Sequence, residues 1–268
     1  MRKAALLLVV AMAAAALGVV TVRHSAGSRS SPQLMLREDF DGSQIDRSRW
    51  RTCYWWAVRG CTIASNHELQ WNRPEQVRVR GGALRLVAQR SRPRGSDGGI
   101  HRYVSGMISS GPGRGSSRPK FAFRYGRAEI RARVPTGKGL WSAFWLLPVN
   151  RASKPEIDVM EIIGQRPEVV EFHLHWRAPN GTAKQRGERW ADGGLRSGWH
   201  TFAIDWRPGN LAWLVDGVVR WRVRGAVVPS TPMYLIVNLA VGGQWPGAPG
   251  SSTTFPSALL VDSVKVWR

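Results

Sequence analysis

From Arg37 onward, hydrophobic and polar residues follow patterns with a period of two, which is typical of half-buried β-strands. The clearest example is residues 125–134, where small or aliphatic residues occupy the even positions and Tyr, Arg and Glu occupy the odd positions. Almost no stretch carries a helical period over three turns. The pattern therefore predicts an all-β protein.

Two segments combine strand patterns with a turn that tolerates positive φ. Residues 77–88 contain Gly81-Gly82 at their centre, and residues 211–223 contain Asp216-Gly217. Both arrangements predict β-hairpins. Many short antiparallel strands with Gly- and Pro-rich connections favour a sandwich or barrel over an α/β fold.

The amino-terminal segment has a different pattern. A basic start, Met1-Arg2-Lys3, precedes a mostly apolar run over residues 4–22, as in an export signal. The run could also remain in the bilayer as an anchor, because about 17–25 apolar residues suffice to span it. Residues 24–33 are rich in Ser, Arg and Gly and predict a flexible tether.

These features divide the chain into two parts. Residues 1–33 are expected to form a signal peptide or N-terminal membrane anchor with its tether, and residues 34–268 a single folded domain with one core. We expect the protein to be secreted to the extracellular side, or tethered to the outer face of the cytoplasmic membrane.

Cys53 and Cys61 are the only cysteines, and they lie close together downstream of the export signal. A local disulfide is the natural interpretation outside the cytoplasm, with a pair of reduced buried thiols as the alternative. Two cysteines without a nearby histidine do not complete a metal coordination shell.

The net charge of +21 would suit a nucleic-acid partner. Most of the excess is Arg, however, scattered over alternating strand positions, and an exported protein rarely meets nucleic acid. We therefore expect no nucleic-acid partner. An Arg-rich solvent face is the simpler interpretation, and attraction to an anionic envelope polymer or polysaccharide is the alternative.

Three acids occur within a short strand-like run whose other members are mostly aliphatic, residues 155–164. On a regular strand Glu156 and Asp158 would share one face, while Glu161 would point into the core at a high energetic cost. A single β-bulge after Asp158 returns Glu161 to the face of the other two acids. The sequence therefore predicts a bulged strand with three carboxyls on one surface.

Like charges at close range push proton affinities apart, so that one carboxyl stays ionised while another holds a proton. Retaining glycoside hydrolysis needs this division: one carboxylate attacks the anomeric carbon and a carboxylic acid about 5–5.5 Å away protonates the leaving oxygen. A solvated acidic strand edge, the alternative, does not explain the aliphatic residues between the acids.

The chain contains 14 tryptophans, a number that calls for an explanation beyond packing. Three of them lie in strand patterns and are expected in the core or at a sheet edge: Trp206, Trp213 and Trp267. Six lie beside Gly, Pro or polar residues: Trp55, Trp56, Trp71, Trp141, Trp145 and Trp245. Exposed flat rings need a cover. Sugar rings provide one, so this second group favours a carbohydrate-binding groove.

The run Glu156-Ile157-Asp158-Val159-Met160-Glu161 resembles the bulged active-site signature of glycoside hydrolase family 16, as in laminarinase-like endo-β-glucanases. Other segments resemble consecutive parts of that family in the same order: 66–71, 103–108, 123–127, 139–148, 173–176, 199–202, 234–243 and 261–267. The resemblance extends from about Leu36 to the carboxyl end.

The resemblance implies a β-jelly-roll sandwich of two curved antiparallel sheets with a concave substrate cleft. By position, Glu156 resembles the nucleophile and Glu161 the general acid/base. Asp158 resembles the residue between them that hydrogen-bonds the nucleophile.

The same resemblance implies a set of substrate-binding residues. Trp141 and Trp145 match rings that stack on sugars, and the polar matches near the same subsites are Asn66, His175 and Asn238. We add Trp245 from the second tryptophan group.

No cofactor is expected. His173 and His175 share a strand face, but the sequence shows no third ligand beside them, so we expect a cleft histidine rather than a metal site. Some relatives carry a structural calcium near the position of Asp262. The chain has no loop with the dense acidic spacing of a dedicated calcium site, and a structural calcium is left open.

The favoured function is an endo-acting retaining hydrolase of β-1,3- or mixed β-1,3-1,4-glucan, expected to be a monomer with a polysaccharide substrate. Two departures qualify the substrate: Ser142 stands where relatives often carry Pro, and the loop over residues 53–61 is not general in the family. Alternatives are another polysaccharide, such as a galactan or anionic envelope polymer, or transglycosylation. A non-catalytic glucan-binding protein is disfavoured because the three acids are intact.

Overall fold

The computed structural model describes residues 32–56, 61–116 and 118–268, and Pro32–Arg268 form one compact unit. The export signal or anchor expected in residues 1–31 lies outside the described residues. Within the described part, the structure contains no helix that is both long enough and apolar enough to cross a membrane.

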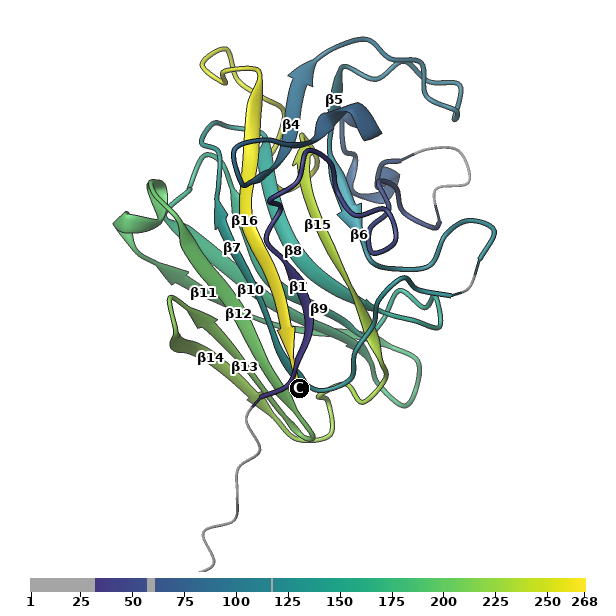
Figure 1. Cartoon of the computed structure of the whole chain (residues 1–268), viewed down its shortest axis with the longest axis vertical. Coiled ribbons are helices and arrows are strands. Elements are labelled where there is room, and N and C mark those ends of the chain that lie inside the picture. The colour runs from purple at the N-terminus through teal and green to yellow at the C-terminus, as the bar shows by residue number, and fades with distance from the viewer. Residues whose placement is uncertain (1–31, 57–60, 117) are drawn as a thin grey trace, which may run out of the picture. The chain divides into compact units, whose positions relative to one another are not determined.

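Two β-sheets make up the fold (Figure 1). The smaller sheet has the order β11-β10-β9-β8-β15-β6. Its strands are β6 (Met107–Ser109), β8 (Leu140–Pro148), β9 (Glu156–Ile163), β10 (Val169–Arg177), β11 (Ala183–Ala191) and β15 (Met233–Val241). All neighbouring strands in it are antiparallel.

The larger sheet follows the order β14-β13-β12-β7-β16-β4-β5-β2, with β1 beside β16 and β3 beside β4. Its strands are β1 (Leu34–Glu38), β2 (Gln70–Asn72), β3 (Val77–Val79), β4 (Leu84–Arg90), β5 (Tyr103–Ser105), β7 (Gly126–Arg133), β12 (His200–Arg207), β13 (Asn210–Val215), β14 (Val218–Arg224) and β16 (Ser257–Trp267). The helices of the described residues are three short 3-10 turns: η1 (Ala64–Asn66), η2 (Pro74–Gln76) and η3 (Gly193–Arg196). The predicted all-β jelly-roll sandwich is confirmed.

The local patterns explain these strands. In β7, Ala128, Ile130 and Ala132 are buried, as the alternation over residues 125–134 predicts. Both predicted hairpins form, β3–β4 and β13–β14. The second one turns at Asp216 and Gly217, whose φ angles are 50° and 79°, the left-handed region that Gly and Asp tolerate.

A single large core lies between the two sheets. It takes buried aliphatic and aromatic side chains from both layers, including Trp206 and Trp213 at 0% exposure. Trp267 is only partly buried near the end of β16. These positions agree with the packing role expected for the first tryptophan group, and they leave the outer face of the smaller sheet for the site.

Cys53 and Cys61 form a disulfide, as expected. A second, smaller hydrophobic cluster surrounds it on the outer face of the smaller sheet, with Tyr54, Trp145 and Tyr234 among its buried members. The disulfide therefore closes a loop whose aromatic side chains contact Trp145 of β8 and Tyr234 of β15.

Candidate active site

Strand β9 contains the predicted bulge. Met160 pairs with Phe144 of β8 and Asp158 pairs with the next residue, Trp145, so Val159 is an extra residue without a partner. The same irregularity occurs opposite β10. Ile157 and Val159 are fully buried, whereas Glu161 is only partly buried and reaches the outer face. The bulge brings Glu161 to the side of Glu156 and Asp158, as the sequence predicts.

A core tryptophan supports the bulge from below. The indole Nε1 of Trp213, on β13 of the opposite sheet, donates a hydrogen bond of 2.8 Å to the backbone oxygen of Asp158. A bulge disrupts the ladder locally, and a buried carbonyl without a partner is costly. The larger sheet thereby stabilises the irregular backbone that carries the acids.

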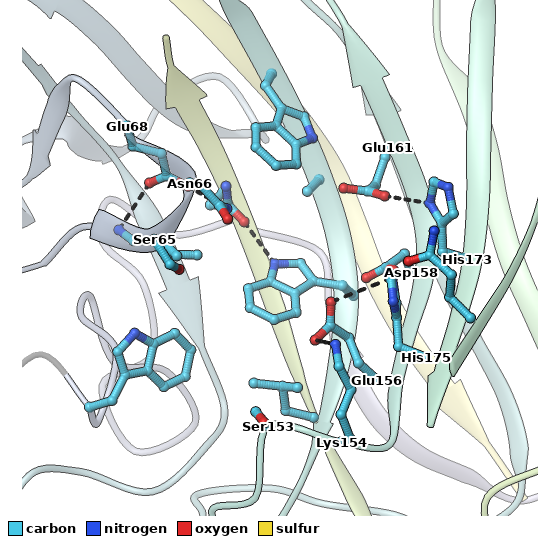
Figure 2. A pocket seen from close by; sticks show the side chains of 18 of the residues that line it. Ser65, Asn66, Glu68, Ser153, Lys154, Glu156, Asp158, Glu161, His173 and His175 are labelled. Atoms are coloured by element: carbon cyan, nitrogen blue, oxygen red, sulfur yellow. Dashed lines mark hydrogen bonds and ion pairs between the residues drawn. The ribbon is translucent and has the colours of Figure 1, made fainter. Parts of the chain in front are cut away.

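The three acids open into a cavity of about 740 Å³ on the outer face of the smaller sheet (Figure 2). Its wall is partly aromatic, and the tryptophans in it are Trp55, Trp56, Trp141, Trp145 and Trp245. Polar residues include Asn66, Glu68, His173, His175, Gln185 and Asn238. Apolar walls with a few convergent polar groups are the usual composition of a ligand site.

Glu156 has a lysine, a histidine and another acid as its polar neighbours. Nζ of Lys154 is 2.9 Å from its Oε2, and Nε2 of His175 is 3.9 Å from its Oε1. Burial and the charge of Asp158 raise the pKa of Glu156, while Lys154 and His175 oppose that rise. Lys154 in particular favours the ionised form of Glu156.

Asp158 is the most deeply buried of the three acids, at 3% exposure. Burial and the charge of Glu161 raise its pKa, and contact with His175 limits the rise. Nε2 of His175 lies 3.1 Å from Oδ2 of Asp158, but Oδ2 has no hydrogen-bond partner of good geometry. Burial therefore disfavours the charged form of Asp158 unless a donor or a cation lies beside its carboxylate.

Glu161 is held by His173, whose Nδ1 is 2.7 Å from Oε2 of Glu161 (Figure 2). Burial opposes a charge on His173, but the hydrogen bond and the charge of Glu161 outweigh it and raise the pKa of His173. Gly187 on β11 makes room for this ring: a Cβ there would lie 2.5 Å from Cδ2 of His173. His173 can therefore reach Glu161 because residue 187 is a glycine.

Behind His173 lies another buried acid, Glu171, with Oε2 4.0 Å from Nε2 of the imidazole. Glu171 forms ion pairs with Arg166 and Arg189, and Nη2 of each arginine lies 3.3 Å from its Oε1. The negative charge at this end of the cavity is thus concentrated on Glu161 and its neighbours on β9.

The aromatic walls are themselves fixed by hydrogen bonds and ring contacts. Nε1 of Trp145 donates to Oδ1 of Asn238 at 2.8 Å. Trp141 and Trp245 meet edge to face with centroids 5.2 Å apart. Rings held in this way present defined faces to a ligand.

Each predicted substrate-binding residue lies in the cavity wall: Asn66, Trp141, Trp145, His175, Asn238 and Trp245. Asn238 is 4% exposed and orients Trp145, so its side chain acts through that ring. Trp71, included in the groove-forming tryptophan group, does not line the cavity. It is buried and packs on His101 with centroids 4.6 Å apart, because β2 lies in the other sheet.

Polar residues of the cavity that sequence reasoning missed include Glu68, Lys154, Glu171 and Gln185. Lys154 had a signal, since it lies two residues before Glu156 and thus on the same side of an extended chain. Glu68 is a buried acid that accepts hydrogen bonds from Ile63 N and the Gln70 amide, and burial raises its pKa.

Two groups bear on metal binding. Asp262 contacts Nη1 of Arg131 at 3.2 Å, and a guanidinium there does not fit a calcium ion. Within the described residues, Asp158, His173 and His175 each offer a ligand atom, and these atoms lie within 4.8 Å of one another.

Comparison with known proteins agrees with this geometry. The family model "Glycosyl hydrolases family 16" matches residues 64–255. The chain is 33% identical over 296 residues to a beta-glucanase of Rhodothermus marinus, covering 100% of this chain and 95% of that protein. It is 31% identical over 245 residues to an endo-1,3-1,4-beta-glycanase of Rhizobium meliloti (strain 1021), covering 86% of this chain and 50% of that protein.

Solved structures are similar over most of the domain. The laminarinase of Rhodothermus marinus aligns with a TM-score of 0.74 at 32% identity, covering 89% of this chain and 98% of that one. An endo-beta-1,3-glucanase of Pyrococcus furiosus aligns with a TM-score of 0.75 at 28% identity, covering 88% of this chain and 94% of that one.

Proposed function

Because this chain belongs to glycosyl hydrolase family 16, we propose that it is an endo-acting retaining glycosidase that hydrolyses internal β-1,3- or mixed β-1,3-1,4-glucosidic bonds. The observation that carries the proposal is the bulge at Val159, which places Glu161 beside Glu156 on the floor of an aromatic-walled cavity. The names of the matched proteins support this choice: a beta-glucanase, an endo-1,3-1,4-beta-glycanase and an endo-beta-1,3-glucanase.

In the first step, Glu156 attacks the anomeric carbon and forms a glycosyl ester while Glu161 protonates the departing glycosidic oxygen. In the second step Glu161, now ionised, removes a proton from water, and the water oxygen displaces Glu156. Lys154 favours an ionised nucleophile through its contact with Oε2 of Glu156.

His173 supports the acid/base Glu161, as Lys154 supports the nucleophile Glu156. Its hydrogen bond to Glu161 fixes the orientation of a side chain that must alternate between donating and accepting a proton. The rings of Trp141 and Trp145 offer faces for glucosyl units on the cavity wall. Endo action follows if the cavity accepts a chain that continues past the cleaved bond on both sides.

Location outside the cytoplasm is part of this proposal. It is supported by the signal-like pattern of residues 1–22 and by the Cys53–Cys61 disulfide, since such bonds persist in oxidising compartments. The protein would then act as a secreted enzyme or from an N-terminal anchor on the outer face of the membrane.

Product analysis tests the substrate. The chain without residues 1–31 is incubated with laminarin, barley mixed-linkage glucan, agarose and carrageenan, and the oligosaccharides are identified. We expect internal cleavage of laminarin or barley glucan, with retention of anomeric configuration by NMR of the first products. Cleavage of agarose or carrageenan alone would assign a galactan instead, and an inverted product would overturn the mechanism.

Substitution of Glu156 by Gln tests the nucleophile. The amide keeps the shape of the side chain but cannot form the glycosyl ester, so we expect no measurable hydrolysis and an unchanged unfolding transition. Glu161→Gln should reduce kcat by about 10²–10⁴-fold, the usual contribution of a general acid. Glu188→Gln, on exposed strand β11 outside the cavity wall, is the matched control and should retain full activity.

An anionic polysaccharide remains the second candidate on sequence grounds, but the cavity does not favour it. Its two clearest cations are already engaged. Lys154 pairs with Glu156, and Arg151 donates to the backbone oxygens of Gly113 and Ser116. A non-catalytic binding function is disfavoured, because binding alone does not require a bulge that brings three acids to one face of the cavity.

A further inference from the structure

We propose that the floor of the active-site cavity binds one divalent transition-metal ion, of the zinc or copper class, through Asp158, His173 and His175, and that the bound ion inhibits the enzyme. Metal binding stands on the geometry of these three residues alone. Only the inhibition rests on the proposed hydrolase function.

Strand register explains why the third ligand is not visible in the sequence. His173 and His175 point the same way from β10, and across the β9–β10 ladder His173 pairs with Asp158. The bulge sets this pairing, because without it a different residue of β9 would face His173. The two histidines, which have no third ligand nearby in the sequence, thus lie close to the carboxylate of Asp158 on the neighbouring strand (Figure 2).

The spacing is close to that of a coordination shell. One ligand atom of each residue lies within 4.8 Å of the others, and Nε2 of His175 is 3.1 Å from Oδ2 of Asp158. Zinc binds imidazole nitrogen and carboxylate oxygen at about 2.0–2.2 Å in a tetrahedron, which places ligand atoms roughly 3.4 Å apart. The ligand atoms would therefore have to move closer together on binding, and the His173 ring is only partly buried.

The unsatisfied oxygen of Asp158 is an independent sign of a cationic ligand. Oδ2 is buried in a residue with 3% exposure and lacks a hydrogen-bond partner. A buried acceptor without a donor costs free energy, and a bound cation would remove that cost. Two imidazoles and one carboxylate suit zinc, copper or iron better than calcium or magnesium, which prefer shells of oxygen atoms.

Inhibition follows from the position of Asp158 between the two catalytic glutamates on β9. An ion bound there would lie between the two side chains that must act on the scissile bond, and would compete with the sugar ring for that space. The ion also recruits His173, which otherwise holds Glu161. We therefore expect a fall in kcat rather than a simple rise in KM.

The test uses the chain without residues 1–31 and without a histidine tag, dialysed against EDTA. Co²⁺ is added while the visible d–d absorption of the bound ion is followed, and Zn²⁺ binding is measured by calorimetry. Hydrolysis of laminarin is assayed in the same Zn²⁺ series. We expect one ion per chain, loss of kcat in parallel with occupancy, and full recovery on addition of EDTA.

Variants locate the site. His173→Gln and His175→Gln should each weaken Co²⁺ and Zn²⁺ binding by at least about 10-fold, since even supporting residues of metal sites contribute about 10–100-fold. His101→Gln, which removes a histidine paired with Asp97 elsewhere, is the control and should bind normally. If a histidine variant fails to fold, Gly187→Ala displaces the His173 ring without removing it, and Gly193→Ala, where a Cβ meets no neighbour, is its control.

Absence of Co²⁺ absorption, or equal binding by His173→Gln, His175→Gln and the parent chain, would overturn the site. Binding at full occupancy with unchanged kcat would overturn the inhibition. A chain that binds Co²⁺ but cleaves none of the glucans would retain the metal site and reject the proposed function, so the two failures are distinguishable.

Discussion

Nζ of Lys154 lies 2.9 Å from Oε2 of Glu156, and both side chains are about four-fifths buried, with 21% exposure each. Lys154 comes from the segment just before β9, and it is the nearest cation to the proposed nucleophile. Burial and Asp158 raise the pKa of Glu156, whereas Lys154 counteracts both effects. The contact with Lys154 therefore limits the rise in the pKa of Glu156 in a cavity that disfavours charge.

Replacement of Lys154 by Met should move the acidic limb of the activity profile to higher pH. Glu156 must be ionised to attack, and loss of the cation raises its pKa further, so activity on the acidic side falls while the neutral plateau changes less. The measurement is kcat/KM against pH with EDTA present. Lys184→Met on exposed β11 serves as the control, and superimposable profiles for Lys154→Met and the parent chain would contradict the assignment.

Trp213→Phe should lower both stability and activity. The smaller ring leaves a cavity in the core, and the Asp158 carbonyl at the bulge also loses its 2.8 Å hydrogen bond, at a cost of about 1–3 kcal/mol for a buried acceptor left unpaired. Activity should fall as well, since the bulge directs Glu161. Urea unfolding and kcat are the measurements.

Trp221→Phe is the matched control for this experiment, because Trp221 packs against Trp213 with centroids 4.2 Å apart and comes from the neighbouring strand β14. This variant changes the ring contact with Trp213 but keeps the hydrogen bond from Trp213 to the Asp158 carbonyl. Equal unfolding midpoints for Trp213→Phe and the parent chain would show that the hydrogen bond contributes little.

The bulge also illustrates how far sequence reasoning reaches. Three acids among aliphatic residues predict it because Glu161 would otherwise be buried alone. The pattern does not predict which cross-strand partners the bulge creates. The contacts of His173 with Glu161 and Asp158 depend on a register between β9 and β10 that no local pattern encodes.

Trp71 was expected to be exposed, but tertiary contacts bury it. Its polar neighbours in the sequence suggest an exposed ring, but β2 pairs with β5 in the larger sheet, and His101 from a distant loop covers the indole. Burial of a ring beside polar residues is decided by tertiary contacts. The alternation of β7, by contrast, is a local property, and it was predictable residue by residue.

Trp56→Ala should weaken binding of long glucans. Trp56 lines the cavity, stacks on Tyr54 with centroids 4.5 Å apart, and belongs to the loop closed by Cys53 and Cys61. A stacked ring contributes about 0.5–1.5 kcal/mol beyond its buried area, so KM should rise about 2- to 10-fold with little change in kcat.

Laminari-oligosaccharides of increasing length provide the measurement, and the effect should grow with length. Reduction of the Cys53–Cys61 disulfide should act in the same direction, with the mass change on reduction confirming the bond. Trp199→Ala is the control, because Trp199 lies under Arg131 and Arg133 of the larger sheet. Equal KM values for Trp56→Ala and the parent chain at all lengths would remove Trp56 from the binding surface.

His200 should make stability depend on pH. Its Nδ1 lies 2.8 Å from Oδ2 of Asp216, and its Nε2 lies 3.0 Å from the Gly194 oxygen and 3.1 Å from the Ser197 oxygen. Three acceptors around one imidazole favour the doubly protonated ring. Burial opposes that charge, but these contacts outweigh it and raise the pKa of His200.

A pKa that is higher in the folded than in the unfolded state stabilises the fold below the unfolded value of about 6.5. That stabilisation is lost as the pH rises through the folded value. Because the Asp216 side chain is 47% exposed, the pair contributes at most about 1 kcal/mol. His200→Gln should therefore lower the unfolding free energy more at acidic than at alkaline pH, as urea titrations at both pH values would measure.

Asp216→Asn is the matched variant, since Asn tolerates the positive φ of the turn and can still accept from Thr201 N. It removes the charge that raises the pKa of His200, so the parent chain should lose more of its stability than Asp216→Asn does between acidic and alkaline pH. If both chains lose the same amount, the charge of Asp216 does not govern this part of the stability, and the hydrogen bonds to the Gly194 and Ser197 oxygens would have to account for it.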